Sequence, residues 1–133
     1  MPQKQAFRMT DQRRAIIEAL QGVTTHPTAD EVYAMVKGDL PRISLGTVYR
    51  NLEFLASAGA ILRLDGCGSQ MRFDGCIQSH DHVRCTTCGR VDDVPGAPVA
   101  MKKSPPTVNG YLITGHRLEY LGYCRACKRG KKR

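Results

Sequence analysis

The residues with the clearest metal-binding chemistry are four cysteines in two Cys-x-x-Cys pairs. They are Cys85, Cys88, Cys124 and Cys127, and 35 residues separate the pairs. Tetrahedral Zn²⁺ takes four thiolates at about 2.3 Å, and a two-residue spacer lets one turn present both sulfurs to one ion. Two redox-active or disulfide-forming pairs are the alternative. The pattern favours a structural zinc ion with no open coordination position.

A second group of possible ligands begins at the segment Ser79-His80-Asp81-His82. In an extended segment, alternate side chains project to the same face, so His80 and His82 can bind one ion while Asp81 points away. Further imidazole and carboxylate ligands are available in the sequence, and the whole set suits Fe²⁺, Mn²⁺ or Zn²⁺. The candidate set is His26, Asp74, His80, His82 and Asp93.

The first half of the chain has the pattern of three helices followed by a hairpin. Thr10 can cap a helix over 11–21, Thr28 and Glu31 form a capping-box pattern at the next helix, and Ser44 can cap a third helix that runs to Gly59. The segments 60–64 and 71–73 then predict a short two-stranded wing around a turn at 66–68. This order is typical of a winged helix-turn-helix, although other small helical domains share it.

The second half has shorter segments typical of strands, at 83–85, 89–94, 110–115 and 116–124. Four prolines in 95–106 leave room for only a short helix, around 97–103. We expect a hinge near 74–79. The fold class is therefore α+β, with a winged-helix DNA-binding domain over 1–75 and a small α/β domain over 76–133 that holds the four-cysteine zinc site.

The start of the third helix favours nucleic-acid binding. It would expose Thr47, Arg50 and Asn51 where backbone N–H groups can meet phosphates and side chains can meet base edges. The formal charge of +8 is weaker evidence. Residues 1–75 are nearly balanced in charge, and the excess lies mainly in the basic tail, which is typical of a solvated terminus.

Composition also indicates the compartment. The N-terminus lacks the apolar core of a secretory signal, and no run approaches the roughly 20 apolar residues of a membrane span. Cytoplasmic thiols stay mostly reduced, which favours metal ligation over disulfides. We therefore expect a cytoplasmic protein with no membrane association.

Several motifs, taken in order, resemble the Fur family of metalloregulators. They are HPTADEVY, ISLGTVYRNLEFL, RFD, SHDHVRCTTCGRVDDV and HRLEYLGYC, and the resemblance covers roughly residues 8–127. It implies a winged-helix domain, a dimerisation domain with structural zinc, and a homodimer that binds a palindromic double-stranded operator when its regulatory metal is present. The resemblance places the regulatory ligands on the same five residues named above. It also places base-reading residues at Tyr49 and Arg50, and a basic residue that enters the minor groove at Arg8.

Within this family, the ligand types favour the peroxide-sensing PerR branch. Asp74 and Asp93 are both aspartates, as in that branch, whereas iron-sensing members tend to have Glu; the zinc-sensing branch commonly has Cys at position 74. Arg50, in contrast, is more typical of iron sensors. The resemblance thus implies structural Zn²⁺ and regulatory Fe²⁺ or Mn²⁺, with peroxide as the signal and an iron-responsive repressor as the alternative. Ser79 and Ala100 stand where some members have ligands of a further metal site, so Asp81 and His116 are expected to be structural or solvent-facing.

Other functions receive less support from the sequence. Cys67 and Cys76 lie outside the zinc set and could form a thiol switch, although small buried or loop cysteines are the simpler explanation. A zinc hydrolase using His80, His82 and Asp93 would need a general base and a substrate pocket, and the sequence indicates neither, so we do not expect an enzyme. A zinc-ribbon interaction module is opposed by the capped third helix with its polar residues.

Overall fold

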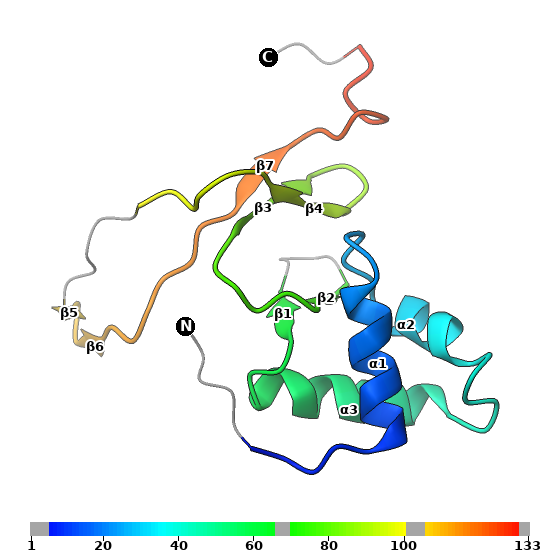
Figure 1. Cartoon of the computed structure of the whole chain (residues 1–133). Coiled ribbons are helices and arrows are strands. Elements are labelled where there is room, and N and C mark those ends of the chain that lie inside the picture. Colours follow the sequence, from blue (N-terminus) through cyan, green and yellow to red (C-terminus); the bar gives the residue numbers. More distant parts are fainter. Residues whose placement is uncertain (1–5, 66–69, 101–105, 131–133) are drawn as a thin grey trace. The chain divides into compact units, whose positions relative to one another are not determined.

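A computed structural model describes residues 6–65, 70–100 and 106–130 of the 133-residue chain. The chain divides into two compact units, Met1–Gln78 and Ser79–Arg133. Each unit has its own elements (Figure 1). Within the described ranges, no helix is long and apolar enough to cross a membrane.

Three capped helices form most of the first unit. They are α1 (Asp11–Gln21), α2 (Ala29–Val36) and α3 (Leu45–Ser57). Each begins where a hydroxyl side chain accepts a hydrogen bond from a backbone N–H of the first turn: Thr10 from Arg13, Thr28 from Glu31 and Ser44 from Thr47. The Glu31 carboxylate also accepts from the Thr28 N–H at 3.2 Å, which completes the capping box. The predicted helix starts are therefore confirmed.

The helices bury one apolar cluster together with a two-stranded wing. Strands β1 (Leu62–Leu64) and β2 (Arg72–Asp74) pair antiparallel, and the predicted turn at 66–68 lies outside the described residues. The core is the set of fully buried apolar side chains that these elements share. It includes Ile16, Leu20, Val32, Val36, Val48, Leu52, Leu55, Ile61 and Phe73. The predicted helix, helix, helix, wing order is the one observed.

A three-stranded sheet in the order β4-β3-β7 organises the second unit. Strands β3 (Asp81–Cys85) and β4 (Val91–Val94) pair antiparallel around the first cysteine turn, and β7 (Tyr120–Gly122) pairs parallel with β3. The apolar core is small, because Cys85 and Val91 are the buried hydrophobic residues among the described part of this unit. Such a unit needs stabilisation beyond hydrophobic burial.

A separate hairpin, β5 (Thr107–Val108) and β6 (Tyr111–Leu112), lies between β4 and β7 along the chain. Asn109 and Gly110 form its turn with φ of 47° and 80°, as a type I′ turn requires. The strand expected over 110–115 is shorter, Tyr111–Leu112, and the Asn-Gly turn pairs it with β5, a pairing that the strand pattern alone does not predict. Residues 97–100 are not helical, and the rest of the helix predicted around 97–103 lies outside the described residues.

The different burial of two leucines on α3 predicts that truncating them lowers the free energy of unfolding by different amounts. Leu52 is fully buried, whereas Leu45 is 36% exposed at the first turn. Leu52→Ala should lower the free energy of unfolding by about 2–5 kcal/mol because it removes core contacts and leaves a cavity. The measurement is urea denaturation of the zinc-loaded protein. Leu45→Ala is the matched control and should cost less than about 1 kcal/mol; equal losses would contradict the described packing.

Candidate metal centres and nucleic-acid interface

The parallel pairing of β3 with β7 brings the two Cys-x-x-Cys turns together. Cys85 ends β3 opposite Gly122, and the Thr86 N–H donates to the Gly122 carbonyl at 2.9 Å, so both strands end at the same level. The chain then turns at 86–88 and at 125–127, and each turn is closed by a backbone hydrogen bond. The pairing places both cysteine turns at one end of the sheet.

The four sulfurs have the spacing of a zinc site. One sulfur from each of Cys85, Cys88, Cys124 and Cys127 lies within 4.8 Å of the others, and the Cys88 and Cys124 sulfurs are 3.9 Å apart. Four thiolates at about 2.3 Å from a tetrahedral ion would be about 3.8 Å from one another. The residues present therefore fit a structural Zn²⁺, and the predicted cluster is formed.

Backbone hydrogen bonds prepare the cysteines for ligation. N–H groups donate to the Cys85 sulfur, first that of Cys88 and next that of Cys124 at 3.4 Å, and lower the Cys85 pKa to about 6. The Cys124 pKa is also lowered, chiefly by the backbone N–H of Cys127. A side-chain hydrogen bond with Cys124 instead raises the Cys127 pKa to about 12. This hydrogen bond favours the protonated form of the Cys127 thiol, and a bound cation would displace that proton.

In the first unit, His26 and Asp74 form one group of possible metal ligands. The Nε2 atom of His26 is 3.2 Å from Oδ2 of Asp74, and both side chains are buried. The Cys76 N–H donates to the other carboxylate oxygen, Oδ1, at 2.9 Å, which fixes the carboxylate plane. One imidazole nitrogen and one carboxylate oxygen therefore face each other within this unit.

The backbone explains why His26 and Asp74 meet. Residues 26–28 run beside β2: the Phe73 N–H donates to the Pro27 carbonyl at 3.0 Å, and Arg72 Nη1 donates to the His26 carbonyl at 3.1 Å. His26 itself has φ of 53°, a left-handed conformation uncommon for a non-glycine residue.

Gly75, the residue after Asp74, is required by close packing. A Cβ at this position would lie 2.8 Å from the Gln21 backbone nitrogen at the end of α1. Gly75 therefore lets the end of β2 approach the end of α1, a contact that could not be predicted from the sequence.

The second unit contributes His80, His82 and Asp93. His82 pairs directly with Asp93 in the register of β3 and β4, and His80 lies two residues before His82 on the same face. The Nε2 atoms of His80 and His82 are 3.1 and 3.4 Å from the same Asp93 oxygen, Oδ1, and their ring centroids are 4.4 Å apart. The two histidines thus share one face, as the His-x-His spacing predicts, and both Nε2 atoms lie beside the Asp93 carboxylate.

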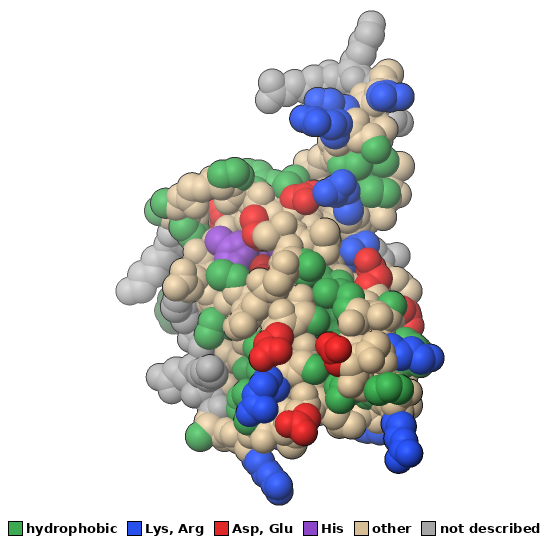
Figure 2. Space-filling model, turned by 45° about the vertical axis from the view of Figure 1, so that its right-hand side comes forward, with side chains coloured by type: hydrophobic (Ala, Val, Ile, Leu, Met, Phe, Trp, Pro, Cys, Tyr) green, Lys and Arg blue, Asp and Glu red, His purple; other side chains and the backbone are tan. Residues whose placement is uncertain are grey.

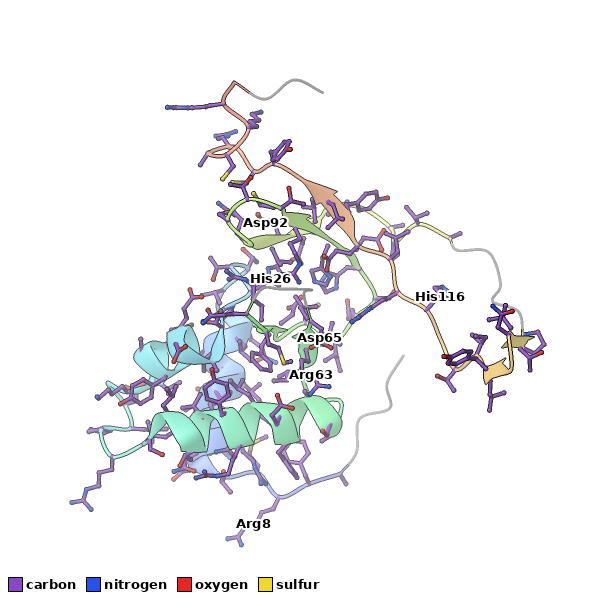
Figure 3. All side chains as sticks on the ribbon, turned by 180° about the vertical axis from the view of Figure 1, so that it is seen from behind. Arg8, His26, Arg63, Asp65, Asp92 and His116 are labelled. Carbon is purple, nitrogen blue, oxygen red and sulfur yellow. The ribbon has the colours of Figure 1, made fainter. Side chains whose placement is uncertain are left out.

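Asp81 and His116 lie outside this group of possible ligands. Asp81 accepts a hydrogen bond from the Val99 N–H at 2.9 Å, in agreement with the expectation that it points away from the histidines. His116 is exposed on the extended segment between β6 and β7 (Figure 3) and belongs to neither group of possible ligands.

A half-buried ion pair between Arg84 and Glu119 was not predicted from the sequence. The Arg84 side chain is 7% exposed, and its Nε and Nη2 atoms donate to the two Glu119 oxygens at 2.8 and 3.4 Å. This bidentate pair joins β3 to the segment before β7. The two residues lie 35 positions apart in separate segments, so their spacing in the sequence does not indicate that they pair.

The predicted DNA-contacting residues at α3 differ in their surroundings. Tyr49 and Arg50 are exposed, whereas Thr47 and Asn51 are half-buried. Arg50 Nη2 donates to Thr47 Oγ1 at 3.1 Å, and Asn51 Nδ2 donates to the Thr47 carbonyl at 3.0 Å. The exposed pair can reach a ligand directly; for all four, contact with DNA stays a prediction.

Arg8 and the basic tail are the other positively charged parts of the chain that the sequence analysis singled out. The Arg8 side chain projects into solvent from the segment before α1 (Figure 3). In the described part of the tail, Arg125, Lys128 and Arg129 are exposed around the second cysteine turn, where Figure 2 shows basic side chains. Lys131, Lys132, Arg133 and Cys67 lie outside the described residues, and Cys76 is an exposed free thiol.

Comparison with known proteins identifies a regulator family. A sequence model described as Ferric uptake regulator family matches residues 4–121. The peroxide operon regulator of Bacillus subtilis is 36% identical over 124 residues, covering 92% of this chain and 85% of that protein.

Solved structures agree with the sequence matches. The Campylobacter jejuni peroxide stress regulator has a TM-score of 0.60 at 26% identity, over 89% of this chain and 87% of that chain. The Helicobacter pylori ferric uptake regulator Fur, described as having three functional metal-binding sites, has a TM-score of 0.70 at 20% identity, over 95% and 85% of the two chains. The latter likeness concerns the fold.

The cysteine cluster predicts that replacing a cysteine inside it removes zinc binding, whereas replacing one outside it does not. Cys124→Ser should abolish stoichiometric zinc binding and unfold the second unit, because its small core cannot replace the metal. Cys76→Ser, a free cysteine outside the cluster, is the matched control and should keep one zinc per chain. Elemental analysis and circular dichroism measure both effects. Full zinc content in Cys124→Ser would exclude the four-thiolate site.

Proposed function

Because the chain belongs to the ferric uptake regulator family, we propose that it is a metal-dependent transcriptional repressor. It would bind palindromic operator DNA as a homodimer and respond to peroxide. The observation that carries the proposal is that thiol ligands and imidazole or carboxylate ligands form separate groups in the chain. A closed set of four thiols fits structural zinc, while imidazoles and carboxylates in each unit offer the nitrogen and oxygen ligands that suit Fe²⁺ or Mn²⁺.

The two units have separate roles in this proposal. Residues 1–75 would form the DNA-binding domain, with Tyr49, Arg50, Thr47 and Asn51 on or beside the helix that enters the major groove and Arg8 in the minor groove. Residues 76–133 would form the dimerisation domain. The protein would act in the cytoplasm, where reducing conditions keep the four thiols available for zinc.

We propose that His26 and Asp74 of the first unit bind the same regulatory ion as His80, His82 and Asp93 of the second. An ion held by ligands from both units would fix their relative orientation, and the DNA-binding domains of a dimer need a fixed orientation to meet two half-sites together. The donor types and the pairwise convergence inside each unit support this assignment. No catalytic turnover is involved, so the protein would be a regulator and not an enzyme.

Peroxide sensing would use these same histidines. Bound Fe²⁺ would supply the redox chemistry that activates hydrogen peroxide beside its ligands. His26 or His80 would then gain one oxygen atom on an imidazole carbon, while peroxide loses that oxygen and leaves as water. An oxidised ring is a poorer nitrogen donor, so the metal-held orientation of the two units would be lost together with operator affinity.

Metal dependence gives the first test of this function. Mn²⁺ or Fe²⁺ should create operator affinity, and His80→Ala should remove it while one zinc per chain remains, because His80 lies outside the thiol cluster. His116→Ala is the matched control, since it removes an exposed imidazole from the same unit, and it should bind operator DNA as the unmodified chain does. Fluorescence anisotropy with a labelled operator measures both. Metal-independent binding by His80→Ala would refute the regulatory assignment.

The signal is tested by mass spectrometry of the Fe²⁺-loaded protein after treatment with peroxide. We expect one added oxygen on the peptide that holds His26 or His80, and a parallel loss of operator binding. The Mn²⁺-loaded protein is the control and should stay unmodified. Loss of metal and DNA binding without any added oxygen would instead favour the alternative function, an iron-responsive repressor, for which the arginine at position 50 is the supporting feature.

A further inference from the structure

Arg13 of α1 lies where three parts of the first unit meet. Its Nη1 atom donates to the Arg8 carbonyl at 2.7 Å, and its Nε atom donates to Asn51 Oδ1 at 3.3 Å. The same guanidinium therefore contacts the arm before α1, defined here as residues 6–10, and the helix α3. Both partners are residues assigned above to DNA recognition.

Two aromatic rings hold the Arg13 guanidinium in place. Its central carbon lies 3.9 Å from the centroid of the Phe54 ring and 5.9 Å from that of Phe7. The two rings meet edge to face, with centroids 5.5 Å apart and an interplanar angle of 86°. Phe7 belongs to the arm and Phe54 to α3, so cation–π and aromatic contacts join the same two segments as the hydrogen bonds.

The hydrogen bonds continue from Arg13 to the exposed part of α3. Asn51 accepts from Arg13 through its amide oxygen and donates to the Thr47 carbonyl through its amide nitrogen, while Thr47 Oγ1 accepts from Arg50. The path therefore runs from the Arg8 backbone through Arg13, Asn51 and Thr47 to Arg50. Its two ends carry the side chains proposed to enter the minor and the major groove.

We propose that Arg13 is a positioning residue for DNA recognition, which fixes the arm that carries Arg8 against α3 so that the two grooves are contacted together. This inference rests on the proposed function. Without the bridge, the arm would have to be ordered when DNA binds, and that loss of conformational freedom would reduce affinity. Arg13 itself is half-buried, so its effect passes through Arg8 and α3 and does not require contact with DNA.

The chemistry requires arginine at this position. A planar guanidinium can donate in two directions within its plane and still present its face to an aromatic ring, whereas a lysine ammonium is a point donor on a flexible stem. Arg13→Lys keeps the charge and should lose the bridge. Arg14, the next residue, provides a matched control: its side chain is 57% exposed, and it forms a surface ion pair with Asp11 at 3.5 Å.

The experiment measures operator affinity of the zinc-loaded, Mn²⁺-activated protein at one fixed salt concentration. Arg13→Met and Arg13→Lys should each weaken operator binding by roughly tenfold, the size expected for loss of one arginine contact with DNA. Arg14→Met, which removes the same charge one residue away, should change it by no more than about twofold. In an Arg8→Ala background, Arg13→Met should have almost no further effect, because Arg13 would have lost the group that it positions.

Several outcomes would overturn the inference. Equal weakening by Arg13→Met and Arg14→Met would mean a general charge effect, and additive losses in Arg8→Ala with Arg13→Met would mean that Arg13 acts independently of Arg8. Unchanged affinity of Arg13→Lys would show that charge alone suffices, and this conservative variant decides the case if Arg13→Met does not fold. If the unmodified chain binds no operator under activating metal, the proposed function fails instead.

Discussion

The parallel pairing of β3 with β7 is the contact on which the second unit depends. Nothing local can produce it, because Val83 and Tyr120 are far apart in sequence and a parallel pair needs a long connection. The pairing places the two cysteine turns at one level, and four sulfurs binding one ion would in turn hold the strands in register. Strand pairing and metal ligation therefore stabilise each other in a unit with little apolar core.

The register of the same sheet also determines which side chains lie beside Asp93. His82 lies opposite Asp93 because β3 and β4 are joined through the first cysteine turn, and His80 follows by the two-residue period of a strand. A shift by one residue would move both histidines to the opposite face. The structural zinc site would thus preserve the geometry of the histidines that we propose as ligands of the regulatory ion.

The sequence predicted what depends on near neighbours along the chain. The caps at Thr10, Thr28 and Ser44 and the shared face of His80 and His82 follow from spacings of two or three residues, and the structure contains them. The two cysteine pairs could be combined into one site because zinc demands four ligands.

Contacts between distant segments could not be predicted in this way. Arg13 and Asn51 are 38 residues apart, and Arg84 and Glu119 are 35 residues apart. The spacing of these residues in the sequence does not indicate either contact. The need for glycine at position 75 likewise arises from the backbone of α1, which approaches it only in the folded unit. These contacts are therefore visible only in the folded structure.

The backbone at His26 shows what the site demands of the fold. A left-handed φ of 53° costs a non-glycine residue roughly 1 kcal/mol, and this residue also has its ring buried beside a carboxylate. Glycine would relieve the backbone but would supply no imidazole. Under the proposed function, the position is a compromise in which the need for a metal ligand outweighs stability. Substitutions that stabilise the apo fold and substitutions that preserve the sensor would be opposed to each other at this single residue.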